Sequence, residues 1–277
     1  MQLIRDILIP FCLLHSHTTI KSQGIFYPVS THHLTAAQFA PEVTDAFIAA
    51  VNPAMAAYVT NFSACLYTEK RFMSAELMLI KVAAAFKFSG SGLALQLQHF
   101  GTSIYNEKVA GISYGKTLGK LSIGAGFNYH MVHIPDNGIR LLGASIASIW
   151  KVSEKVYAFC MLSNPPLFRA KHYEKSFRLS SEFRAGMGYL TAENLYLGIE
   201  SKKDEGRTAQ LIASLRYQFA QDKFIRCSWT TGNNQPFINL GWSKKVLRFE
   251  AGFHYHPSLG ISPDFILIYH VPSTKES

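Results

Sequence analysis

The chain has 277 residues, of which 48% are hydrophobic and 16% are charged, and its formal net charge is +9. This composition excludes a disordered polymer, because such chains carry too few apolar residues to build a core. A helical membrane protein is disfavoured because no apolar run approaches about eighteen residues. The basic residues are scattered and form no basic helix or RNA-binding aromatic motif, so nucleic acid is not expected as a partner.

Residues 1–24 resemble an export signal. Arg5 supplies positive charge, and residues 7–14 supply a short apolar stretch. The four cysteines lie far apart and show neither CxxC nor zinc-site spacing, so we expect reduced thiols at Cys12, Cys65, Cys160 and Cys227.

Residues 25–56 form a different kind of segment, which is rich in alanine and lacks strand alternation. Val43, Phe47 and Val51 fall on roughly one helical face. Pro53 should end this helix and hold Asn52 in an extended conformation. The segment is predicted to fold into a barrel lumen as a plug, because side chains of a wide wall cannot fill such a lumen. A surface helix in the periplasm is the alternative.

Residues 57–271 repeat stretches of alternating apolar and polar side chains. In the clearest stretch, 121–131, Leu121 and Phe127 share one face while Ser122 and Asn128 share the other. Strands in globular proteins usually end after about five or six residues, whereas a tilted strand needs about nine to eleven residues to cross a bilayer. The pattern therefore predicts an all-β protein, a transmembrane antiparallel β-barrel.

Turn residues divide this region into about fourteen strands. An even number returns both ends of the barrel to one side of the membrane. Residues 272–277 form a short tail. The expected strands are 57–69, 73–88, 91–101, 105–116, 119–134, 138–151, 155–163, 175–190, 193–204, 207–220, 222–231, 234–244, 246–256 and 261–271.

Strand alternation also assigns the two faces of the wall. The lipid-facing band should include Leu121, Ile123, Phe127, Leu179, Phe183, Leu215, Phe249 and Phe253. The charged and polar residues on the opposite face indicate a filled, non-conducting lumen, because opposite charges on neighbouring strands can pair across it. The lumen-facing residues should include Gln96, Gln98, Arg178, Glu182, Arg184, Glu200, Arg216, Arg248, Glu250 and His254.

The sequence offers only weak candidates for catalytic or metal-binding residues. A lipid hydrolase needs a hydroxyl nucleophile beside a base, and the candidates are Ser122 with His99 or His130, or Ser258 after His256. His254 and His256 could share a metal with Glu250, but a polar ladder with Arg248 is favoured because ligand spacing alone is weak support. The sequence thus predicts no catalytic residue, metal or cofactor.

Residues 43–57 contain Asn52, Pro53 and Ala54 and lead directly into the first strand. This arrangement resembles the entry to the barrel of FadL-like outer-membrane proteins, particularly the PorV/PorQ group of Bacteroidetes type IX secretion. Residues 105–126 resemble the strand–turn–strand of the same group. The resemblance implies a fourteen-stranded barrel with an inward N-terminal segment.

These observations favour a protein of the bacterial outer membrane that acts as a non-enzymatic accessory or scaffold in protein secretion or surface assembly. Its expected partners are outer-membrane lipid and proteins of that complex. A FadL-type transporter or channel for hydrophobic or small solutes is one alternative. An outer-membrane lipid hydrolase is a second.

Strand register gives a first test. Phe127→Arg should impair membrane insertion by about 2–4 kcal/mol if the residue lies near the midplane, because a charge would face lipid. Asn128→Arg, one residue further along, should be tolerated because this side chain faces the lumen. Folding into lipid vesicles measures both variants, and equal tolerance would contradict the register.

Overall fold

The computed structural model describes residues 24–35, 37–135, 137–165, 177–192, 194–232 and 235–271. The proposed export signal lies outside these ranges up to residue 23, as do Cys12 and the tail at 272–277. Cys65, Cys160 and Cys227 are free thiols. In the described ranges, no helix has both the length and the apolar character needed to span a membrane.

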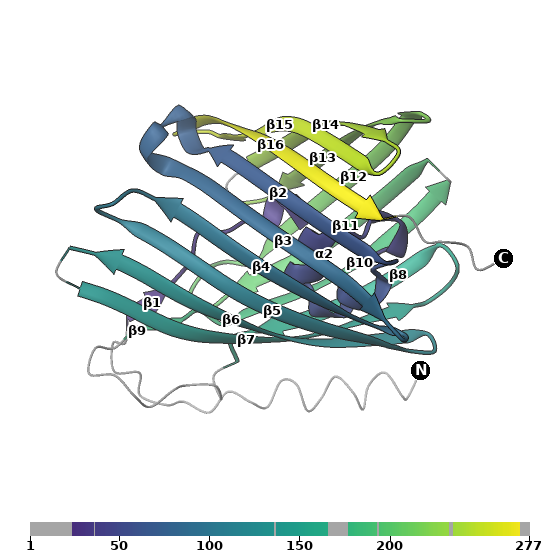
Figure 1. Ribbon diagram of the computed structural model, residues 1–277, viewed down its shortest axis with the longest axis horizontal. Coiled ribbons are helices and arrows are strands. Elements are labelled where there is room, and N and C mark those ends of the chain that lie inside the picture. Colours follow the sequence, from purple (N-terminus) through teal and green to yellow (C-terminus); the bar gives the residue numbers. More distant parts are fainter. Residues whose placement is uncertain are drawn as a thin grey trace.

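Fourteen antiparallel strands form one closed barrel in the described part of the chain, which confirms the predicted fold class (Figure 1). The ring closes where the last strand pairs with the first. Its strands are β2 (Phe62–Lys70), β3 (Met78–Phe88), β4 (Ser91–Gly101), β5 (Asn106–Leu118), β6 (Leu121–Ile134), β7 (Asn137–Lys151), β8 (Val156–Ser163), β10 (Glu182–Ala192), β11 (Leu195–Asp204), β12 (Gln210–Ala220), β13 (Lys223–Thr230), β14 (Gln235–Lys244), β15 (Leu247–His256) and β16 (Gly260–Val271).

Tight turns gather at one end of the barrel, which is hereafter the tight-turn end. Ser89 and Gly90 join β3 to β4 there, and both have positive φ. A two-residue hairpin of this kind matches the twist of the flanking strands. The other end, the loop end, carries the longer connections, including η4 (Arg71–Met73) and η5 (Ala75–Leu77) between β2 and β3.

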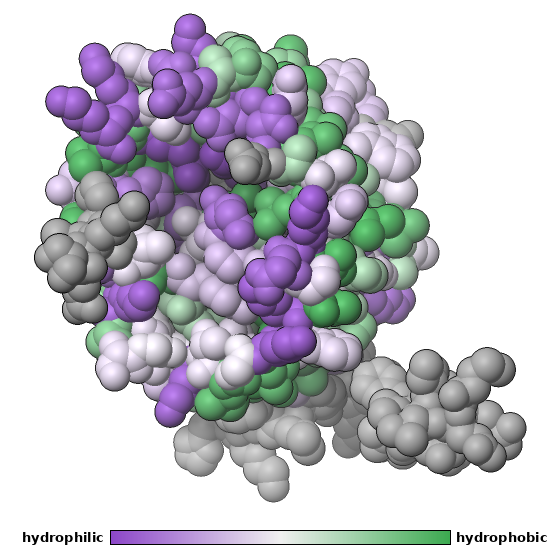
Figure 2. All heavy atoms as spheres, turned by 90° about the vertical axis from the view of Figure 1, so that its right-hand side faces the viewer, coloured by the Kyte–Doolittle hydropathy of each residue, from purple (hydrophilic) through white to green (hydrophobic). Residues whose placement is uncertain are grey.

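The outer surface of the wall is apolar. Leu121, Ile123 and Phe127 are exposed on β6, whereas Ser122 between them is fully buried. Hydrophobic residues occupy the flanks of the barrel, and hydrophilic residues gather on its tight-turn end (Figure 2). A closed ring satisfies the backbone groups of every strand, so such a surface can face hydrocarbon. The ring and its apolar outer surface are those of a transmembrane β-barrel.

The expected strand 175–190 is interrupted. β9 (Phe177–Leu179) leaves the wall and pairs in parallel with β1 (Gly24–Phe26), and the wall resumes with β10. The assignment of Leu179 to the lipid-facing band was therefore wrong: Leu179 is buried and packs against Gly143 of β7. Arg178 likewise lies on β9 rather than on a wall strand, because the backbone of β9 bonds to β1.

The segment that begins with β1 and leads to β2, residues 24–59, passes through the lumen and is called the plug here. It contains η1 (His32–Thr35), η2 (Pro41–Val43), α2 (Ala46–Val51) and η3 (Pro53–Tyr58). Phe47 of α2 packs in a buried cluster with wall residues that include Tyr67 and Ile266. Ile48 and Met55 of the plug belong to a second buried cluster, which also contains Phe159. Figure 1 shows α2 inside the ring.

Local sequence sets the helix boundaries in the plug. Asp45 caps α2, because its Oδ1 accepts hydrogen bonds from the backbone N–H groups of Phe47 (2.9 Å) and Ile48 (3.0 Å). The helix ends at Val51, and Asn52 is extended as its position before Pro53 requires. Asn52 Oδ1 then accepts from the Ala54 N–H at 3.2 Å and caps η3.

A row of three glycines forms the seat of η3. Gly92 of β4 pairs with Gly115 of β5, which pairs with Gly124 of β6. A Cβ on Gly92 would lie 1.8 Å from the Ala56 carbonyl oxygen, and one on Gly115 would lie 2.4 Å from that of Pro53. The backbone of η3 therefore rests directly on the backbone of the wall, and a side chain at these positions would displace it.

Gly115→Ala should lower the free energy of unfolding by about 1–3 kcal/mol, because the added methyl overpacks the seat of η3. Gly138→Ala is the matched control, since its Cβ would meet only the Val132 carbonyl oxygen, at 4.0 Å. Denaturant unfolding in detergent micelles measures both. Equal stability of the two variants would contradict the close approach of η3 to the wall.

Candidate functional site

At the loop end, the first residues of the plug bond to strands β3 to β5. The Val29 N–H donates to Glu107 Oε2 at 2.9 Å, and Gln98 Nε2 donates to the Val29 carbonyl at 3.2 Å. Lys81 Nζ donates to Thr31 Oγ1 at 3.1 Å. These bonds fix the plug in the mouth of the barrel.

On the opposite wall, β11 binds the middle of the plug, and Arg184 of β10 pairs with one of the residues that bind it. Glu200 Oε2 accepts from the Ala37 N–H at 3.0 Å, while its Oε1 accepts from Arg184 Nε at 2.5 Å. The Tyr196 hydroxyl accepts from the Phe39 N–H at 2.9 Å and donates to the Ala37 carbonyl at 2.7 Å. The wall thus satisfies backbone groups of a plug segment that has no regular structure of its own.

A buried charge network lies beside the N-terminus of α2. Arg248 forms an ion pair with Asp45, and its Nε lies 2.9 Å from Glu250 Oε1. Arg226 Nη2 lies 2.8 Å from Glu250 Oε2. Arg216 stacks its guanidinium over the Phe224 ring, 3.7 Å from the ring centroid. Asp45 therefore caps α2 and ties the plug to β15 with the same carboxylate.

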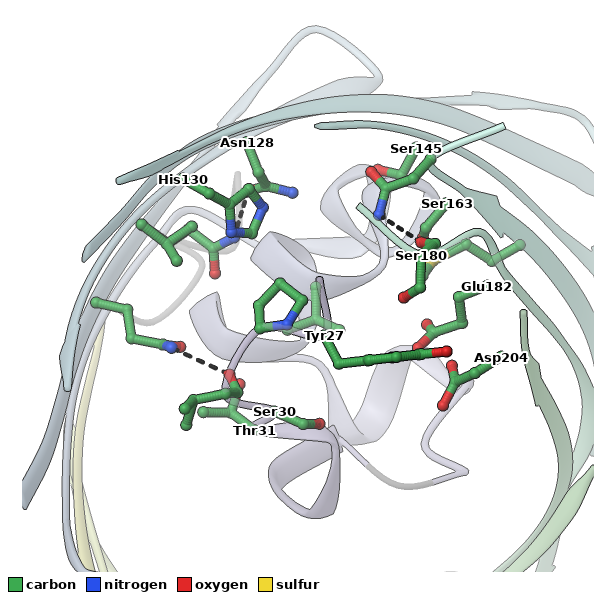
Figure 3. A pocket seen from close by; sticks show the side chains of 18 of the residues that line it. Tyr27, Ser30, Thr31, Asn128, His130, Ser145, Ser163, Ser180, Glu182 and Asp204 are labelled. Carbon is green, nitrogen blue, oxygen red and sulfur yellow. Dashed lines mark hydrogen bonds between the residues drawn. The ribbon is translucent and has the colours of Figure 1, made fainter. Parts of the chain in front are cut away.

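A cavity of about 190 Å³ lies between the plug and the wall (Figure 3). Tyr27 to Thr31 of the plug form one side, and α2 contributes Ala50 and Val51. The wall contributes mainly amide, hydroxyl and charged side chains from β3 to β11, including Lys81, Gln96, Gln98, Asn128, His130, Ser145, Ser163, Glu182, Lys202 and Asp204.

One lysine of this cavity lies between two carboxylates. Lys202 Nζ lies 3.2 Å from Glu182 Oε2 and 3.3 Å from Asp204 Oδ2. Gln96 Nε2 donates to Asn128 Oδ1 at 2.7 Å. The cavity thus offers both donors and acceptors to a solute, and it carries charges of both signs.

The structure distributes the predicted lumen-facing residues over distinct places. Gln96, Gln98 and Glu182 line the cavity, whereas Glu200 bonds to the plug and Arg184 pairs with Glu200. Arg216, Arg248 and Glu250 belong to the network beside α2, and Arg178 pairs with Glu205 near the mouth. His254 contacts Glu69 rather than Glu250, with 3.4 Å between Nε2 and Oε1. Asn52, Pro53 and Ala54 are buried at the seat of η3.

The suggested hydrolase residues do not come together. Ser122 and His130 both lie on β6, and eight residues of strand separate them by about 26 Å. Ser122 Oγ donates to the Tyr58 hydroxyl at 3.0 Å, and His99 faces outward. His256 Nδ1 accepts from the Ser258 backbone N–H, not from its hydroxyl. None of these candidate serines has a histidine activating its hydroxyl.

Several residues that hold the plug escaped the sequence analysis. The role of Asp45 as an N-cap could have been predicted, because aspartate is common at the position directly before a helix. Tyr196 and Glu107 alternate correctly for the inner face, but alternation does not reveal their partners. The row of Gly92, Gly115 and Gly124 becomes visible only when the strand register is known.

Comparisons with known proteins agree on the fold. No family model and no curated protein sequence matches the chain. The outer membrane protein Omp33 of Acinetobacter baumannii is 7% identical with a TM-score of 0.53, over 76% of this chain and 98% of that one. A deletion mutant of TodX, described as a monoaromatic hydrocarbon channel, is 8% identical with a TM-score of 0.54, over 80% of this chain and 92% of that one. At these identities the similarity extends to the barrel fold.

Asp45→Asn should lower the free energy of unfolding by about 1–3 kcal/mol, because Arg248 loses one of its two carboxylate partners and keeps only Glu250. Asparagine still caps a helix, so the variant isolates the ion pair. Glu154→Gln is the control: its pair with Lys151 is exposed at a turn and should contribute less than about 1 kcal/mol. Denaturant unfolding compares them, and equal losses would argue against a buried pair at Asp45.

Proposed function

We propose that this protein is a gated outer-membrane channel for small polar solutes and that the plug is its gate. The observation that carries the proposal is the polar cavity inside the lumen, whose surface is shared between the plug and the wall. A solute that enters from the loop end would contact both. Movement of the plug away from the wall would then open a path toward the tight-turn end.

The lining of the cavity supports the solute class. Lys81 and Lys202 supply positive charge, and Glu182 and Asp204 supply negative charge among hydroxyl and amide groups. The donors and acceptors of this lining match the hydrogen-bonding groups of a neutral or zwitterionic solute. The same donors and acceptors would lack hydrogen-bond partners against a hydrocarbon. The fold is shared with a hydrocarbon channel, but this lining favours polar cargo.

The contacts of the plug support a closed resting state. Hydrogen bonds and ion pairs from β3, β5, β11 and β15 reach it, and η3 rests on the glycine row near the tight-turn end. Opening requires these bonds to be exchanged for others, which makes the barrel conduct only when the plug is displaced.

The same closure supports a second candidate function, a non-enzymatic scaffold of a secretion or surface-assembly complex. A plug held from several sides of the ring suits a barrel that acts through its rims. Purification from native membranes in mild detergent, followed by mass spectrometry, tests this candidate. Partner proteins in stoichiometric amounts would favour the scaffold, and a barrel recovered alone would count against it.

Ser145→Phe should reduce solute flux at least severalfold, because Ser145 lines the cavity and the larger side chain would fill it (Figure 3). Ser148→Phe on the outer face of the same strand is the control and should leave flux unchanged. Swelling of proteoliposomes in small sugars and amino acids measures the flux. A barrel that passes none of these solutes, either as the wild type or after Asp45→Asn loosens the plug, would refute the channel.

A further inference from the structure

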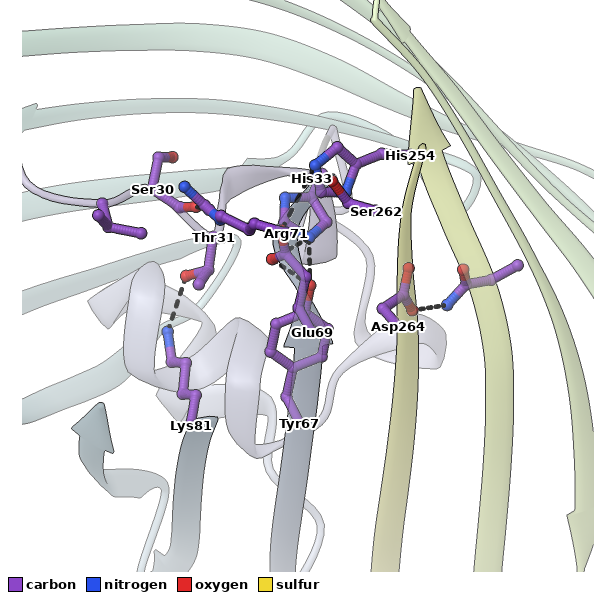
Figure 4. Close-up of polar contacts among 12 residues, drawn as sticks. Ser30, Thr31, His33, Tyr67, Glu69, Arg71, Lys81, His254, Ser262 and Asp264 are labelled. Atoms are coloured by element: carbon purple, nitrogen blue, oxygen red, sulfur yellow. Dashed lines mark hydrogen bonds and ion pairs between the residues drawn. The ribbon is translucent and has the colours of Figure 1, made fainter. Parts of the chain in front are cut away.

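We propose that His33, Glu69 and His254 form a binding site for a divalent transition-metal ion, with Zn²⁺ as the best match. The three residues come from separate segments: η1 of the plug, β2 and β15. Their ligating atoms all lie within 4.8 Å of one another. Figure 4 shows the two imidazoles beside the Glu69 carboxylate at the boundary between plug and wall.

The distances suit a metal after a small contraction. His33 Nε2 lies 3.9 Å from Glu69 Oε2, and His254 Nε2 lies 3.4 Å from Glu69 Oε1. Ligand atoms around tetrahedral zinc lie about 3.4 Å apart, since each is about 2.1 Å from the ion. The His254–Glu69 distance already matches this separation, and the His33–Glu69 distance exceeds it by about 0.5 Å.

Burial and donor chemistry also match a metal site. The Glu69 side chain is 0% exposed, while those of His254 and His33 are 12% and 18% exposed. Two imidazoles and one carboxylate form a donor set that zinc uses, with a fourth position left for water. The Tyr67 hydroxyl lies 2.7 Å from His33 Nε2 and donates to Glu69 Oε2 at 2.7 Å. A bound metal would replace Tyr67 as the partner of His33 Nε2, and Tyr67 could then orient the carboxylate from outside the coordination sphere.

Arg71 is the competing cation. Its Nε donates to Glu69 Oε1 at 2.8 Å, and its Nη2 donates to the Ser30 carbonyl at 2.6 Å. A bound metal would take the place of the first contact, and the second would keep the guanidinium in the mouth. The exchange replaces one positive partner of Glu69 by another, so the carboxylate stays compensated.

A bound metal would form coordinate bonds to the plug, to β2 and to β15. These two strands lie on either side of β16, so the ion would link the plug to the wall there. The loop end of the plug would then be fixed independently of the ion pair between Asp45 and Arg248. This inference concerns the stability of the plug and holds whether or not the barrel conducts.

The test uses the full chain purified in detergent, treated with EDTA and titrated with Zn²⁺ by calorimetry, with bound zinc measured by mass spectrometry. We expect one Zn²⁺ per chain. His33→Gln and His254→Gln should each weaken binding by more than the ~10–100-fold that the loss of an outer-shell partner costs. His130→Gln, a lumen histidine outside the cluster, should bind as the wild type does. No saturable binding, or unchanged binding in His33→Gln, would overturn the proposal.

A second measurement guards against variants that fail to fold. Circular dichroism first selects variants that retain the barrel. Zn²⁺ should then raise the unfolding temperature of the wild type and of His130→Gln but not that of His33→Gln, because a ligand of the folded state stabilises it. An equal shift in all three proteins would place the ion elsewhere and refute the site.

Discussion

A backbone that crosses hydrocarbon must satisfy its own hydrogen bonds, and this requirement governs the whole molecule. Fourteen strands meet it by closing into a ring, from β2 round to β16. Closure at this size leaves a lumen that the side chains of the wall cannot fill. The plug fills this space, and both buried apolar clusters combine residues of the plug with residues of the wall.

The plug carries many backbone groups that helices and strands do not satisfy, and the wall is built to bond them. Tyr196 and Glu200 bind the extended stretch at Ala37 and Phe39, and Asp45 links the start of α2 to Arg248. Breaking one partner of such a buried pair is costly, so the charged lumen holds the plug in place. The polar cavity occurs where the plug and the wall separate, which is why its lining comes from both.

Much of the wall could be predicted because each strand is long and one face must be apolar. The range expected for β4, 91–101, coincides with the structure, and the outward face of β6 was assigned correctly. The prediction of one wall strand over 175–190 was wrong, because alternation identifies the face of a residue but not the strand to which its backbone bonds. Pro53 predicted the end of α2, whereas the approach of η3 to Gly115 depends on register between strands and has no local signal. The proximity of His33, Glu69 and His254 could not be predicted either, because these residues are distant in the sequence and only the folded barrel brings them together.

The path of the plug also constrains the order in which the protein assembles. Its first strand, β1, pairs with β9 at one mouth, and its last helix, η3, sits near the other. β2 follows almost immediately and forms the closing seam with β16, the pairing that joins the two ends of the barrel sequence. Contacts between such distant segments are slow to form. If the seam closed before the plug was seated, the plug would have to be threaded through the completed ring. Insertion of the plug and sealing of the ring are thus kinetically coupled, and a delay in one exposes the unpaired edges of β2 and β16 during biogenesis.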